Sequence, residues 1–293
     1  VMRFIRLPWS PKTPTHFFPI PVTGHIAAQR ANFDKLRMTK VSTDFARDAA
    51  NWRVYNFKAD SMEGRVRLDI AGRAANNWIN IKGRLIDINA ASLFLLSGAR
   101  NHSPIEGRLY ATANLWADTD TDFFSTLAGT TAIYVRDGRL NKFTLLTHIL
   151  SLIDLKNWIT AKVPNLSQTG IPFKSITANF KGNKGDFYTD NLKLEGPVMD
   201  ITAQGDIAFA SGTMNMRIAL IPFNTINWLV NKIPIIGKNL ASGSSGLLAA
   251  YFQVSGPASD PHVRPKPITS VAEFVAKTLS LPVNIIKPHT IKP

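Results

Sequence analysis

The chain has 293 residues, 45% of them hydrophobic, and its formal net charge at pH 7 is +14. The hydrophobic content is enough for a buried core and excludes a largely disordered chain, and the absence of cysteine excludes disulfides, thiolate nucleophiles and cysteine-based metal sites. The positive charge makes polyanions the first partners to consider, namely nucleic acid, anionic phospholipid or lipopolysaccharide.

The chain begins with a proline-rich stretch, residues 1–24, which predicts an extended lead without a regular element. Its prolines also argue against a signal peptide. No apolar run reaches the roughly 18 residues that a membrane-spanning helix requires. Because the first residue is Val1, we expect the chain to continue from an upstream segment that carries any export signal or membrane anchor.

Alternation of apolar and polar side chains then predicts β-strands along most of the chain. In residues 64–72, Val66, Leu68 and Ile70 alternate with arginine and aspartate. Glycine, asparagine and aspartate between the alternating segments are typical of turns, so consecutive strands are expected to form antiparallel hairpins. The same pattern predicts further strands at 52–58, 77–88, 105–117, 131–140, 175–181, 186–194, 199–210, 213–221 and 247–255.

Helical patterns are few and short. Asn89 and Gly98 are suited to begin and end a helix between them, and a shorter copy follows between Thr121 and Gly129. Residues 141–160 and 270–282 carry apolar side chains at helical spacing. We therefore predict a mainly β protein with a few short amphipathic helices.

Residues 41–60 match residues 176–195 without a gap, which is an internal repeat spaced by 135 residues. A repeat of this kind favours an array of hairpins over two unrelated domains. The matched positions include Phe45 with Phe180, Trp52 with Phe187, Asn56 with Asn191 and Lys58 with Lys193. We accordingly divide the chain into the lead at 1–24, a first half of the sheet at 25–128, a second half at 129–263, and a C-terminal amphipathic helix and tail at 264–293.

The residue patterns of enzymes and metal proteins are missing. The six histidines are scattered without the spacing of a metal site. Asp118, Asp120 and Asp122 alternate as in a calcium loop but lack its glycine and glutamate, and the last two are better placed to favour the start of the following helix. The segment 180–186, "FKGNKGD", lacks the spacing of a phosphate-binding loop and is typical of a hairpin turn. We predict a non-enzymatic protein without cofactor or metal.

The main feature is the apolar face that the alternating strands would share. A sheet covers such a face with a second sheet, with helices or with a ligand, and the predicted helices are too few to cover it. Closure into a sandwich would explain the face, but small inward residues such as Gly83, Ala111 and Ala113 favour a hydrophobic groove that fits acyl chains. The predicted lipid-binding residues of this groove are Val66, Leu68, Ile70, Ile79, Ile81, Leu109, Leu115, Ile201, Ile207, Met214, Met216, Ile218, Phe252 and Val254.

The basic residues alternate with these apolar ones and are expected to form the solvated face of the sheet, near anionic membrane headgroups. The aromatic residues are expected to be buried in the turns between strands, so the pattern of a nucleic-acid interface is absent and we predict no nucleic-acid partner. Residues 211–259 contain no acidic residue. This segment is suited either to the membrane interface or to capping the end of the groove, and its candidate interfacial residues are Trp228, Leu229, Lys232, Ile235, Ile236 and Lys238.

The order of several segments resembles the C-terminal region of the AsmA-like family of bacterial envelope proteins, to which the TamB and YhdP types belong. The segments are "VRDGRLNKFTLL" at 135–146, "GDFYTDNLKLEGP" at 185–197, "IPIIG" at 233–237 and "FQVSGPASDPHV" at 252–263. The resemblance implies a long, curved antiparallel β-sheet with a hydrophobic groove, anchored to the inner membrane and involved in moving phospholipid across the periplasm. It supplies no catalytic residues.

Two functions follow as expectations. The first is a lipid-binding or lipid-conducting groove in the cell envelope that contributes to phospholipid transport between the inner and outer membranes. The second is a scaffold or assembly factor whose sheet edges pair with strands of outer-membrane proteins.

Overall fold

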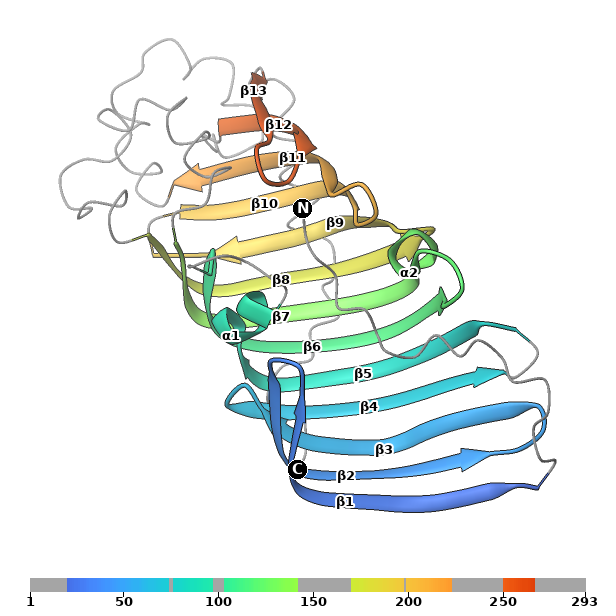
Figure 1. Cartoon of the computed structure of the whole chain (residues 1–293). Helices are drawn as coiled ribbons and strands as arrows, with labels where there is room; N and C mark the ends of the chain where they lie inside the picture. The colour runs from blue at the N-terminus through green and yellow to red at the C-terminus, as the bar shows by residue number, and fades with distance from the viewer. Residues whose placement is uncertain are drawn as a thin grey trace, which may run out of the picture.

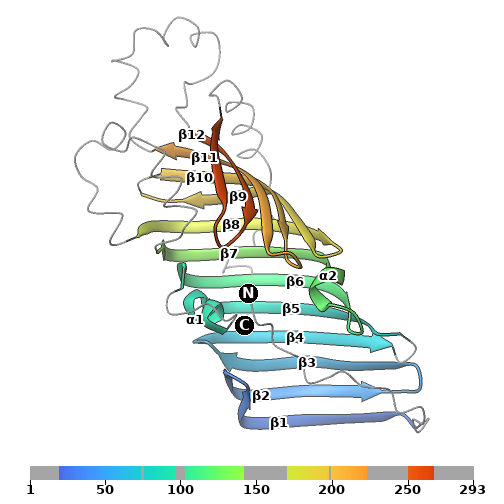
Figure 2. The same cartoon turned by 45° about the horizontal axis from the view of Figure 1, so that its top comes forward.

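The computed structural model describes residues 20–73, 76–96, 103–141, 170–197, 199–222 and 250–266. In this part of the chain, thirteen strands form one antiparallel sheet in which each strand pairs with its neighbours in sequence (Figure 1). The sheet curves but stays open, with the first and the last strand at its two edges (Figure 2). This architecture confirms the predicted fold class, a long curved antiparallel sheet of consecutive hairpins with a few short helices.

Ten of the strands are those that the alternation predicts, with boundaries displaced by at most four residues. The pattern misses β1, β2 and β13, because their polar and small residues obscure the alternation and because Pro265 interrupts β13, where an edge strand tolerates proline. The strands are β1 (Val22–Phe33), β2 (Leu36–Arg47), β3 (Asn51–Ser61), β4 (Gly64–Arg73), β5 (Trp78–Asn89), β6 (Ile105–Asp118), β7 (Ala128–Leu140), β8 (Ile171–Asn183), β9 (Asp186–Glu195), β10 (Met199–Ala208), β11 (Thr213–Pro222), β12 (Ala250–Pro257) and β13 (His262–Lys266).

The two helices are α1 (Ala90–Leu96) and α2 (Phe123–Thr126). Asn89 begins α1 as predicted, since its side chain accepts a hydrogen bond from the backbone N–H of Ser92 at 3.2 Å. Asp122 begins α2 in the same way and accepts from the N–H of Phe124 at 3.3 Å. The expected end of this second helix at Gly129 is wrong. The chain becomes extended at Leu127, and Gly129 is already part of β7, where it pairs with Leu115.

Bulges bend the strands. Asn56, Asp87 and Asp137 have positive φ angles of 55°, 58° and 49°, and each lies where the register of its strand shifts against a neighbour. Asparagine and aspartate tolerate this left-handed conformation better than other residues with a side chain. An extra residue on one strand of a pair increases the local twist and bends the strand, so these positions contribute to the curvature.

The internal repeat is present in the structure. The four strands β8–β11 each begin 135 residues after the corresponding strands β2–β5, at Ile171 against Leu36, Asp186 against Asn51, Met199 against Gly64 and Thr213 against Trp78. The matched Asn56 and Asn191 both lie beside a register shift. The two halves of the sheet therefore share one strand-and-bulge plan.

One apolar cluster runs along a single face of the sheet. It has members on every strand from Phe57 on β3 to Val263 on β13. Helix α1 packs on this face through Ala90 and Leu93, while α2 packs through Phe123 near the opposite ends of the strands, as Figures 1 and 2 show. The two helices cover only the margins of the face near β5–β9.

Candidate functional site

The cross-strand register places all fourteen predicted groove residues on the same face. Directly paired residues of antiparallel strands point to the same side, and the pairs link Val66 to Leu85, Leu85 to Ala111 and Ala111 to Ile133. A second row crosses seven strands, through Leu109, Val135, Ile176, Leu194, Ile201, Leu220 and Ala250. The prediction of one shared apolar face is therefore correct, and contact with lipid stays a prediction.

The fourteen residues differ in how accessible they are. Eight of them are buried: Val66, Ile79, Leu109, Ile201, Met216, Ile218, Phe252 and Val254. The other six are half-buried: Leu68, Ile70, Ile81, Leu115, Ile207 and Met214. In the middle of β5 and β6, Gly83 pairs with Ala113, so the floor of the face is formed by small side chains there. The half-buried residues and this low floor make up the accessible part of the groove.

On β3–β5 the opposite face is polar and basic, as expected. On it, Arg67 pairs directly with both Lys58 and Arg84, and Asp69 pairs with Lys82. Like charges in direct register are unfavourable unless solvent screens them. This face of β3–β5 is therefore a solvated, positively charged surface, clearly separated from the apolar face.

A polar network on the same basic face fixes the bulge in β5. The carboxylate of Asp87 accepts hydrogen bonds from Arg108 Nε at 3.1 Å and Tyr110 Oη at 2.7 Å, and Arg136 lies 3.6 Å away. Arg108 also forms an ion pair with Glu63 at 3.1 Å. The hydrogen bond from Arg108 is the main cause that lowers the pKa of Asp87 to about 2. This carboxylate is fully engaged and is unsuited to act as an acid or base near neutral pH.

No three histidine, aspartate or glutamate side chains in the described residues come together as a metal site. The aspartates of the "ADTDTD" segment serve separate local roles, since Asp122 caps α2 and Asp120 accepts a hydrogen bond from the side chain of Asn77. Within the described ranges, His25 Nδ1 lies 2.7 Å from a carboxylate oxygen of Asp44, close to the edge of the sheet formed by β1.

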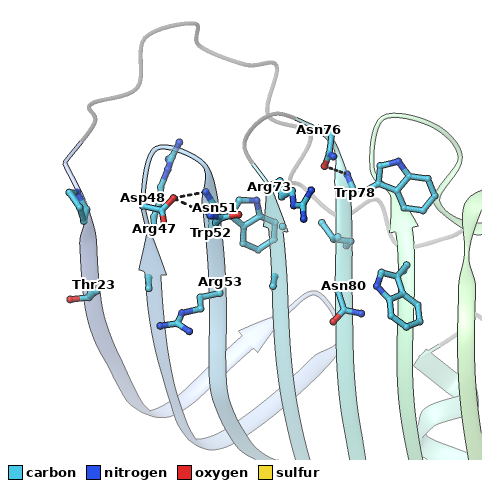
Figure 3. A pocket seen from close by; sticks show the side chains of 16 residues that line it. Thr23, Arg47, Asp48, Asn51, Trp52, Arg53, Arg73, Asn76, Trp78 and Asn80 are labelled. Carbon is cyan, nitrogen blue, oxygen red and sulfur yellow. Dashed lines mark hydrogen bonds between the residues drawn. The ribbon is translucent and has the colours of Figure 1, made fainter.

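A pocket of about 740 Å³ lies at the rim of the sheet, where β2, β4 and β6 end and β1, β3 and β5 begin (Figure 3). Trp52, Trp78 and Trp116 line it, together with Arg47 and Arg73. The expectation that aromatic residues are buried in the turns is wrong here, because Trp78 and Trp116 are 46% and 41% exposed. Both stand on the basic face, which packs against no other described element at this rim.

The pocket carries a positive charge. Three arginines line it, Arg47, Arg53 and Arg73, against the single carboxylate of Asp48. That carboxylate accepts hydrogen bonds from the backbone N–H groups of Ala50 and Asn51, at 2.8 and 2.6 Å, and these donors lower its pKa. Asp48 is thus held within the β2–β3 turn.

The sequence does contain a signal for this rim. The turn "RDAANW" at 47–52 is followed by "RAANNW" at 73–78, so an arginine, an alanine, an asparagine and a tryptophan recur after 26 residues. Two strands, β3 and β4, lie between the two turns. Because consecutive strands run in opposite directions, both turns are at the same end of the sheet. A search for self-similar turns, in addition to self-similar strands, would have found it.

The remaining predicted residues are outside the described part of the chain. All six candidate membrane-interface residues fall within 223–249, and the predicted helices at 141–160 and 270–282 also fall on undescribed residues, apart from Asn141. Among the residues that the structure describes, no helix is long and apolar enough to cross a membrane.

A family model described as YhdP protein matches residues 24–263, which include the strands β2–β12 completely, most of β1 and the whole apolar cluster. The chain belongs to the YhdP protein family. No curated protein and no solved structure gives a significant match. Membership confirms the resemblance to the AsmA-like proteins, and it identifies the chain as a bacterial envelope protein with a β-groove fold.

Proposed function

We propose that this protein binds phospholipid acyl chains on the apolar face of its sheet and conducts lipid along that face, without catalysing a reaction. The observation that carries the proposal is the single apolar cluster that continues from β3 to β13. Each methylene that leaves water contributes about 0.8 kcal/mol, so a face of this length can hold acyl chains at many equivalent positions. Because the two rows traced above, from Val66 to Ile133 and from Leu109 to Ala250, contain only apolar side chains, a lipid chain can move between neighbouring positions on them at little cost.

The proposed location is the periplasm, between the inner and outer membranes, with a tether to the inner membrane from a segment outside this chain. Family membership supports an envelope location. The basic face supports an approach to anionic headgroups, since Lys58, Arg67 and Arg84 present three cations in register. In this arrangement the apolar face carries the lipid chains while the basic face remains in contact with water.

Two adjacent residues of β11 allow a matched test. Met214 is a half-buried member of the apolar cluster, and Asn215 is exposed on the opposite face. We expect Met214→Glu to reduce the phospholipid that co-purifies with the protein by at least about tenfold, because a carboxylate on this face opposes acyl chains. Asn215→Glu adds the same charge and should keep the lipid. Native mass spectrometry and lipid extraction, on protein purified without detergent, measure both.

Circular dichroism establishes that each variant is folded, and Ile81→Glu provides the same test at the other end of the groove if Met214→Glu does not fold. Equal amounts of lipid in a folded Met214→Glu variant and in the Asn215→Glu control would contradict the proposal. A wild-type protein without any lipid would do the same.

A second candidate function, strand pairing with a partner protein, is favoured by β1. This strand of twelve residues pairs only with β2 among the described residues, and it contains neither proline nor lysine, which commonly protect edge strands. Val22 and Ile26 on it are 49% and 52% exposed. Site-specific photocrosslinking from Ala27 in cells tests this role, which predicts one discrete protein adduct. Crosslinks to lipid alone would exclude it.

A further inference from the structure

The rim pocket contains a trough on the basic face of the sheet. Its residues form one cross-strand row, which consists of Arg53 on β3, Ala71 on β4, Asn80 on β5 and Trp116 on β6. Ala71 is two residues beyond Asp69, so the row lies on the basic face and points away from the apolar one. Because adjacent strands are about 4.8 Å apart, the two ends of the row are separated by about 14 Å, with the short side chains of Ala71 and Asn80 as the floor between them.

The rim adds a second arginine and a second tryptophan to this trough. Arg73 and Trp78 lie two residues from Ala71 and Asn80 on the same strands, so they are on the same face. Figure 3 shows both at the strand ends, one level beyond Asn80. Trp78 and Trp116 are the large exposed side chains of the pocket, so their indole rings are open to a ligand.

The two arginines of the trough lack an anionic partner. Within the described ranges, no carboxylate lies within ion-pair distance of Arg53 or Arg73. Arg53 instead lies over the ring of Tyr55, 4.5 Å from its centroid. Guanidinium groups bind carboxylate and phosphate through paired N–H donors, so a ligand with either group would complete the coordination of these arginines.

The uncharged polar groups of the trough also have free positions. The side-chain N–H groups of Asn80 donate to Asn114 Oδ1 and to the backbone oxygen of Leu115, both at 3.0 Å. In the part of the chain that the structure describes, Asn80 Oδ1 accepts no hydrogen bond, and the indole N–H groups of Trp78 and Trp116 have no acceptor. One acceptor and two donors are therefore available beside two aromatic rings.

We propose that this trough binds an acidic oligosaccharide. Sugar rings stack their C–H faces on the indoles of Trp78 and Trp116, which are apolar and flat. Ring hydroxyl groups donate to Asn80 Oδ1, and a carboxylate or phosphate of the glycan binds Arg53 and Arg73. The site lies on the face opposite to the proposed lipid groove, so this inference goes beyond the proposed function and does not depend on it.

A glycan fits the trough better than a bilayer surface does. The cavity of about 740 Å³ has the size of a ligand site, and its floor lies between the aromatic side chains instead of protruding from the sheet. The acyl region of a bilayer would leave Asn80 Oδ1 and the indole N–H groups without partners, whereas hydroxyl groups satisfy them. Two glycans of a bacterial envelope have the required chemistry, namely peptidoglycan and the acidic core sugars of lipopolysaccharide.

The test compares Trp116→Ala and Arg73→Gln with the same kinds of change elsewhere on this face. Tyr188→Ala removes an aromatic side chain that is 42% exposed on β9, and Arg84→Gln removes an exposed arginine outside the pocket. Isothermal titration calorimetry measures binding of two soluble probes, N-acetylglucosaminyl-N-acetylmuramyl tripeptide and the core oligosaccharide released from lipopolysaccharide. At least one probe should bind to the wild type. Each pocket variant should weaken that binding on the order of tenfold, and the two controls should stay near wild type.

The probe that binds identifies the source of the glycan. Neutral chitotetraose should bind more weakly, and binding equal to that of the acidic probes would overturn the proposal, which requires an anionic group. Absence of binding for both acidic probes, or equal losses in Arg73→Gln and Arg84→Gln, would also overturn it. Binding to phosphatidylglycerol vesicles that Trp116→Ala abolishes, without binding of either oligosaccharide, would assign the trough to a membrane surface instead. Arg73→Gln, at an exposed strand end, decides the test by itself if circular dichroism shows that Trp116→Ala does not fold.

Discussion

Asp87 shows how one side chain supports a bend in a strand. Asp87 lies in the β5 bulge and has a positive φ angle. Its carboxylate accepts hydrogen bonds from Arg108 and Tyr110 of β6. Arg136 from β7 adds a more distant charge. A residue with an unfavourable backbone conformation is thus stabilised by partners from the next two strands, which couples the bulge to the registers of β6 and β7.

We expect Asp87→Asn to lower the free energy of unfolding at pH 7 by about 1 kcal/mol. A pKa of about 2 instead of 3.8 corresponds to about 2.5 kcal/mol at most, and the 40% exposure of the side chain reduces this figure. Because the folded-state pKa lies below the unfolded-state value, the contribution is complete above about pH 4 and is lost as the pH falls toward 2.

Urea unfolding of the wild type and the variant, followed from pH 7 to pH 2.5, measures this difference. Asp186→Asn is the control, since Asp186 is exposed and has no side-chain hydrogen bond or ion pair with the described residues. A difference between Asp87→Asn and wild type that is independent of pH would show that the carboxylate charge is not what stabilises the bulge.

At the scale of elements, alternation identifies strands and their faces because the side-chain period of a strand is two. It therefore predicts β4 and β6 to within one residue and assigns every groove residue to the correct side. It cannot locate bulges, because an extra residue leaves no mark in composition. Asn56 and Asp87 are as suitable for a turn as for a bulge, and only their strand partners distinguish the two.

The rim pocket was not predictable from alternation for a related reason. Trp78 and Trp116 are large apolar residues, but here they are 46% and 41% exposed, on a face that packs against no other described element at this rim. Their position follows from the register of β5 and β6, in which Trp78 pairs with Asp118 and Trp116 with Asn80. Register depends on every hairpin in the sheet and is not a local property.

Gly205 tests the importance of one of these register shifts. Its φ angle is 143°, and a side chain there would come within 2.1 Å of the backbone oxygen of Asn215. We expect Gly205→Ala to lower the free energy of unfolding by about 3 kcal/mol, since backbone strain and the clash add. Gly212→Ala in the adjoining turn has a φ of 66° but open space, and should cost about 1 kcal/mol. Thermal and urea unfolding of both variants measure the costs, and equal values would show that the shift at Gly205 is not constrained.

At the scale of the whole molecule, the apolar cluster and the basic surface of β3–β5 lie on opposite faces of one sheet. One face carries the apolar cluster from β3 to β13, and the other carries the basic residues of β3–β5 and the Asp87 network. The repeat of β2–β5 as β8–β11 extends this plan without a change of face. A single open sheet with this separation provides a continuous path, whereas a closed sandwich would bury the apolar face completely.

The path crosses its low floor of small side chains at β5 and β6. Ala113 on β6 is half-buried and pairs with Gly83, so an indole at this position would fill the low floor between the two ends of the groove. We expect Ala113→Trp to slow transfer of fluorescent phospholipid between vesicles several-fold, while lipid still binds at either end. Thr112→Trp places the same indole on the opposite face, beside Arg84 and Ala132, and should transfer lipid at the wild-type rate. Equal rates for the two variants, with both proteins folded and loaded with lipid, would mean that lipid does not pass across β5 and β6, and that the two halves of the sheet act as separate binding surfaces.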